Sequence, residues 1–148
     1  MKQRIYLIFL IVTCLILFAT CLYAGDFHII EEKHVTVVFD PSLRSAAQDV
    51  ADIFPYLRAN LEREIEWDLN LIPSVLLMKD RKLFQRMAES SLTVAFAVPA
   101  RNLIVIDHSR MRVHPFSLEI TLKHELCHLL LHHHIRRHNF PRWLDEGV

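Results

Sequence analysis

The spacing of hydrophobic positions changes along the chain, and each spacing predicts a different element. Between Ser45 and Ile65, hydrophobic residues recur every three or four positions, which predicts an α-helix with one apolar face. This face consists of Val50, Phe54, Leu57, Leu61 and Ile65. The preceding Asp40-Pro41-Ser42 is typical of a turn that starts a helix. Pro55 lies inside the helical pattern, so we expect the helix to be kinked or split there.

Four short segments rich in hydrophobic and β-branched residues predict strands. They are His34–Asp40, Ser74–Lys79, Leu92–Val98 and Leu103–Asp107. The last two are separated only by residues 99–102, so we expect them to form a hairpin. A short helix is predicted between the second and third strands, over Asp80–Ala88.

A long helix is predicted after Pro115, with Ser117 as its N-cap. Glu119 follows in the first turn, where a negative charge suits the helix dipole. Apolar contacts of this helix would come from Leu118, Leu122, Cys127 and Leu130. Together the elements predict an α+β fold in which a small, mostly antiparallel sheet packs on helices, with this long helix at the centre.

The N-terminus has the pattern of a targeting segment. Lys2 and Arg4 precede an uncharged run from Ile5 to Gly25, which is long enough to cross a bilayer. We therefore expect residues 1–25 to be a signal peptide or a signal anchor, with residues 5–24 as the membrane contact and residues 26–148 outside the cytosol. The alternative is a buried core helix. Cleavage is left open, because Leu22-Tyr23-Ala24 is a poor cleavage site.

Length, charge and composition limit the kinds of partner and site that the chain could have. A chain of 148 residues corresponds to about one domain beyond the leader. Its formal net charge is zero, so we expect no nucleic-acid partner. Only 2 glycines occur, which excludes a Gly-rich phosphate loop. Cys127 is the one cysteine after the leader, so the exported part has no internal disulfide. We expect Cys127 to face the core and not to bind metal.

The long helix carries an H-E-x-x-H motif, formed by His124, Glu125 and His128. Histidines four residues apart share one face of a helix, so both imidazoles can reach one zinc ion. Zinc lowers the pKa of a bound water to about 7, and Glu125 could take the proton of that water. The alternative is a polar helix with solvated histidines.

A catalytic zinc usually has three protein ligands, and several residues could be the third. His132 continues the helix stripe but lies about 12 Å along the axis from His124, too far to share one ion with both motif histidines. His134 stands at the position of the last ligand in the metzincin pattern, but Leu131 replaces the glycine that reverses the chain there. Surface exposure is the default expectation for His133 and His138. Glu146 fits better, because Pro141 could open a second helix that returns antiparallel to the first.

The segments "HELCHLLL" and "PRWLDEG" together resemble the gluzincin metallopeptidases, in particular the peptidase MA-like proteins. The resemblance implies a zinc-dependent peptidase acting on a peptide or protein substrate. His124, His128 and Glu146 would bind zinc, and Glu125 would be the general base. The family also pairs extended substrate with an edge strand, for which Thr93–Val98 is our candidate, although an ordinary buried hairpin strand fits equally.

One departure from the family pattern comes after Glu146. Gluzincins continue with an acid that supports a zinc-bound histidine and with a Tyr or His that stabilises the oxyanion, and neither is present here. We therefore expect the metallopeptidase domain of residues 26–148 to be incomplete at its C-terminus. The alternative function is a non-catalytic, extracytoplasmic metal-binding or interaction module.

Overall fold

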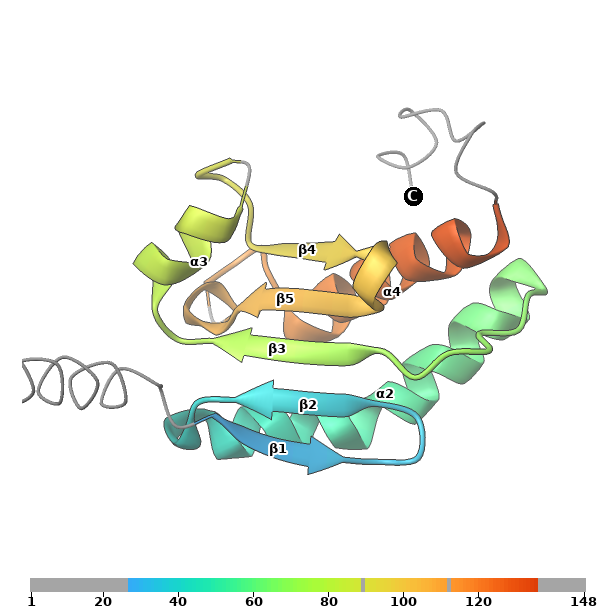
Figure 1. Cartoon of the computed structure of the whole chain (residues 1–148), viewed down its shortest axis with the longest axis horizontal. Coiled ribbons are helices and arrows are strands. Elements are labelled where there is room, and N and C mark those ends of the chain that lie inside the picture. Colours follow the sequence, from blue (N-terminus) through green and yellow to red (C-terminus); the bar gives the residue numbers. More distant parts are fainter. Residues whose placement is uncertain (1–26, 89, 112, 136–148) are drawn as a thin grey trace, which may run out of the picture.

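The protein folds as an α+β domain around one five-stranded sheet (Figure 1). The computed structural model describes residues 27–88, 90–111 and 113–135. The strands lie in the order β1-β2-β3-β5-β4. Their bounds are β1 His28–Glu31, β2 Thr36–Phe39, β3 Ser74–Met78, β4 Ala95–Val98 and β5 Leu103–Asp107. The helices are α2 Arg44–Ile65, α3 Arg81–Met87 and α4 Leu118–His134, with 3-10 turns η1 Pro41–Leu43, η2 Pro99–Arg101 and η3 His108–Arg110.

The sheet is mixed, and the expectation of a mostly antiparallel sheet is wrong. β2 pairs with β3 and β3 pairs with β5 in parallel, whereas only the outer pairs β1-β2 and β4-β5 are antiparallel. The parallel pairing arises because α2 carries the chain back from the end of β2 to the start of β3. Parallel neighbours require such a crossover, and the 22-residue α2 provides it.

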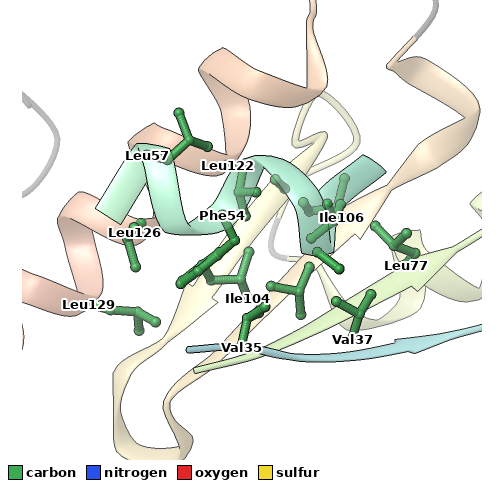
Figure 2. Close-up of a cluster of buried hydrophobic side chains, with 14 of the residues drawn as sticks. Val35, Val37, Phe54, Leu57, Leu77, Ile104, Ile106, Leu122, Leu126 and Leu129 are labelled. Atoms are coloured by element: carbon green, nitrogen blue, oxygen red, sulfur yellow. The ribbon is translucent and has the colours of Figure 1, made fainter. Parts of the chain in front are cut away.

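Two helices cover one face of the sheet and one short helix covers the other. α2 and α4 pack on each other and on the sheet, and their buried side chains form one large cluster with alternate strand residues. Figure 2 shows this cluster, in which Phe54 of α2 and Leu126 of α4 lie against Ile104 of β5. On the opposite face, Phe84 of α3 packs with Val105 in a smaller cluster.

Local sequence signals explain where the helices begin and end. Asp80 accepts hydrogen bonds from the first backbone amides of α3. Ser117 accepts one from the Ile120 amide at 3.2 Å and so caps α4 as predicted. Glu66 adopts a left-handed conformation (φ 60°) where α2 ends. Pro55 is exposed within α2, and the helix runs through it in one piece, so of the kink or split expected there the split does not occur.

The strands and helices predicted between His34 and His134 are found, with ends shifted by a few residues. The second helix expected from Pro141 lies outside the described residues. Strand β4 is the largest shift, because it begins at Ala95 and not at Leu92. β1 was not predicted, since its four residues do not alternate clearly between hydrophobic and polar side chains. Within the described ranges, no helix is both long and apolar enough to span a bilayer. The predicted leader of residues 1–25 lies outside those ranges.

We expect Leu126→Ala to destabilise the domain strongly. Leu126 is fully buried between α4 and the sheet, so its truncation leaves a cavity and should lower the free energy of unfolding by about 2–5 kcal/mol. Ile120→Ala is the matched control, because Ile120 lies on the same helix but is mostly exposed. Its effect should stay within about 0.5 kcal/mol. Equal shifts of the two urea unfolding midpoints would contradict the placement of α4.

Candidate metal centre

Helix α4 brings the two motif histidines together, as predicted from their spacing. The Nε2 atoms of His124 and His128 lie 3.0 Å apart, and their rings meet nearly at right angles with centroids 4.6 Å apart. Two nitrogens bound to one tetrahedral zinc at 2.0–2.1 Å would be separated by about 3.3 Å. The pair therefore needs only a small ring rotation to fit a zinc ion.

Glu125 lies next to this pair and is almost buried. Its residue exposure is 7%, although it carries a carboxyl group. The burial follows from the helix period, because Glu125 is about 100° round the helix from His124 and so turns toward the sheet. His124, Glu125, His128 and His132 line one side of a cleft of about 600 Å³. The carboxyl group is thus placed in the same hollow as the two imidazoles.

The other wall of the cleft is strand β4, together with Thr93, Pro99 and Met87. Side chains on β4 alternate between the two faces of the sheet. Phe96 packs into the cluster on the α3 face, whereas Ala95 and Ala97 contact the core on the α4 face. Ala95 and Ala97 therefore present small side chains on the α4 side of this wall, while Met87, Phe96 and Val98 also line the cleft.

β4 is also an edge strand, since it lies last in the sheet order. One of its backbone edges has no partner strand among the described residues. The Asp107 amide donates a hydrogen bond to the Val94 carbonyl at 2.9 Å, and Ala95 is paired with Ile106. Hydrogen-bonded residues alternate along an antiparallel pair, so the N–H and C=O groups of Ala95 and Ala97 point to the open edge. Strand addition by an extended peptide is geometrically available at these two residues.

His134 is held away from the histidine pair. Its Nε2 donates a hydrogen bond to the Asp68 carbonyl oxygen at 2.8 Å, and its ring stacks on Trp67 with centroids 4.9 Å apart. α4 stays helical through Leu131, so His134 lies about 15 Å along the axis from His124. The structure therefore does not bring His134 into a metzincin-like site.

The third ligand is not found in the described part of the chain. There, no further His, Cys, Asp or Glu joins the His124–His128 pair in a group that could hold a metal ion. His133 is exposed, as expected. Glu146, the preferred third ligand, lies outside the described residues, as does His138.

The far side of α4 is fixed to α2 by polar contacts that the sequence did not reveal. Lys123 Nζ donates to Asn60 Oδ1 and to Glu64 Oε2, each at 2.7 Å. The partners are about 60 positions apart, so no local pattern indicates them. Cys127 is buried nearby, as predicted, and its burial raises the pKa of the thiol. A thiol that stays protonated is a poor metal ligand.

Both motif histidines and the motif glutamate thus share one cleft with an edge strand. Comparison of the chain with protein-family models, with curated proteins and with solved structures finds no match. A functional assignment for this chain therefore rests on the geometry of α4 and β4.

Replacement of His134 should separate structural from metal-binding histidines. His134→Ala removes a hydrogen bond and a ring stack, so it should lower the free energy of unfolding by about 1–2 kcal/mol. Zinc content, measured by elemental analysis, should stay unchanged. His124→Ala and His128→Ala should each lose the zinc, while the exposed His133→Ala serves as the control that keeps it. Zinc retained by the double variant His124→Ala/His128→Ala would rule out this centre.

Proposed function

We propose that the chain is a zinc-dependent metallopeptidase of the gluzincin type, with the zincin-like N-terminal lobe of that group. The single observation that carries the proposal is the approach of two imidazole nitrogens beside a buried glutamate in a cleft walled by an edge strand. His124 and His128 would hold the zinc together with Glu146, and Glu125 would be the general base.

The chemistry assigned to Glu125 follows from its position in the cleft. When bound, zinc supplies a Lewis acid for the substrate carbonyl and lowers the pKa of a water molecule toward about 7. Glu125 takes a proton from the attacking water, whose oxygen bonds to the carbonyl carbon. The same carboxyl then delivers the proton to the amide nitrogen as the C–N bond breaks.

The proposed substrate is a peptide or protein in extended conformation. Its backbone would pair with the open edge of β4 at Ala95 and Ala97, where main-chain groups bind without selecting a sequence. The small side chains of these two residues leave room in the cleft for a larger substrate side chain. We further propose that the domain works outside the cytosol, attached to the membrane by the segment of residues 5–24.

A non-catalytic metal-binding or interaction module remains the competing function, since a histidine pair alone can bind metal. Glu125→Gln distinguishes the two. The amide has nearly the shape of the carboxylate but cannot accept the proton, so peptide hydrolysis should fall by at least about 100-fold. Zinc content should stay the same, because Glu125 is not a ligand. Hydrolysis of a fluorogenic peptide mixture measures the first effect, and unchanged turnover in the variant would exclude the peptidase mechanism.

Glu146→Ala should weaken zinc binding by more than the roughly 10–100-fold typical of residues that only support a ligand. Asp145→Ala is the matched control, because neighbouring residues of the expected second helix would face different sides, so its effect should be smaller. Competition with a chelator of known affinity gives both dissociation constants. If Asp145→Ala proved the more damaging, Glu146 would not be the third ligand.

A further inference from the structure

One end of the sheet gathers chain segments that are far apart in the sequence. In the strand register, His28 lies opposite Phe39, Phe39 opposite Leu77, and Met78 opposite Asp107. The starts of β1 and β4 therefore lie at the same end of the sheet as the ends of β2, β3 and β5, and α3 follows β3 there (Figure 1). We call this end of the sheet the α3 end.

Large hydrophobic side chains are exposed at the α3 end. Leu92 is 85% exposed, and Phe27, Met87 and Leu83 are 49%, 47% and 41% exposed. Leu92 is held near α3, because the adjacent Ser91 carbonyl accepts a hydrogen bond from Arg81 at 3.0 Å. Several exposed apolar residues gathered at one end of a domain indicate a contact surface, whereas single ones do not.

Basic side chains accompany these apolar residues. Lys82 and Arg86 lie one turn apart on α3, on the side opposite the buried Phe84. Lys79 is also exposed. Acids lie here too, since Asp80 caps α3 and Asp40 accepts the Ser42 amide beside Lys79. The basic side chains on the outer side of α3 are Lys82 and Arg86.

This combination fits the surface of a bilayer that contains anionic lipid. Apolar side chains beside exposed Lys and Arg are typical of protein surfaces that lie in the membrane interface. Position also favours a membrane, because Phe27 follows the uncharged segment by two residues and so lies within about 7 Å of its end. A membrane segment at residues 5–24 would hold the start of β1, which lies at the α3 end of the sheet, near the lipid surface.

We propose that the α3 end docks on anionic lipid headgroups, with Leu83 and Leu92 entering the interface and Lys82 and Arg86 contacting the headgroups. This goes beyond the proposed peptidase function and does not depend on zinc. It also differs from simple tethering by the N-terminal segment, which would leave the α3 end near the membrane but in water.

The test uses the full chain in lipid nanodiscs, with Cys14→Ser, Cys21→Ser and Cys127→Ala removing the native thiols. A nitroxide is attached at Leu92→Cys or, as a control, at Ile72→Cys. Ile72 is similarly apolar and 58% exposed, but lies before β3 at the opposite end of the sheet. In discs with phosphatidylglycerol, collisions of the label with a water-soluble nickel chelate should fall about fivefold at position 92 relative to position 72.

Two further comparisons separate docking from tethering. Discs of phosphatidylcholine alone should restore most of the collisions at position 92, and so should Lys82→Glu/Arg86→Glu in anionic discs. Lys82 and Arg86 are both exposed, so the double charge reversal should leave the fold intact. If it does not, the comparison of anionic with neutral discs still tests the proposal, because it uses no charge substitution. Equal accessibility at positions 92 and 72 in anionic discs would overturn the proposal. The proposal would also be overturned if the label at position 92 stayed protected in neutral discs and in the charge-reversed variant, because the N-terminal tether alone would then explain the protection.

Discussion

The burial of one side of α4 against the sheet is the constraint on which the rest of the site depends. Leu122, Leu126 and Leu129 are almost completely buried and fix the rotation of the helix about its axis. With that rotation set, the helix period turns His124 and His128 away from the core and into the cleft. The same hydrophobic contacts that stabilise the domain therefore aim the two imidazoles at the cleft.

Contacts at two levels of α4 then hold the helix against α2. In the second turn, Lys123 bonds to Asn60 and Glu64. At the C-terminal end, His134 bonds to the Asp68 carbonyl just beyond α2. The two sets of contacts lie on either side of the His124–His128 pair in the sequence. The Lys123–Glu64 ion pair is partly exposed and adds little to stability by itself.

The sequence predicted the parts that have a local cause. The three-to-four spacing of Val50, Phe54, Leu57 and Leu61 indicated α2, and Ser117 indicated the start of α4, because both signals act within a few residues. Sheet order could not be predicted in this way, since the parallel pairing of β3 with β5 depends on how whole segments pack. For the site, the helical spacing of His124 and His128 was sufficient to predict their meeting, whereas the buried position of Glu125 depends on which face of α4 meets the sheet.

The short open edge of β4 sets a limit on how tightly an extended ligand can be held. Two outward residues, Ala95 and Ala97, offer two N–H and two C=O groups. At about 0.5–1.5 kcal/mol net for each hydrogen bond, the four groups together supply about 2–6 kcal/mol. Such a free energy corresponds to a dissociation constant of roughly millimolar order. Main-chain pairing at this edge would therefore bind a peptide only briefly, and both the choice of ligand and its residence time would be decided by side chains that enter the cleft.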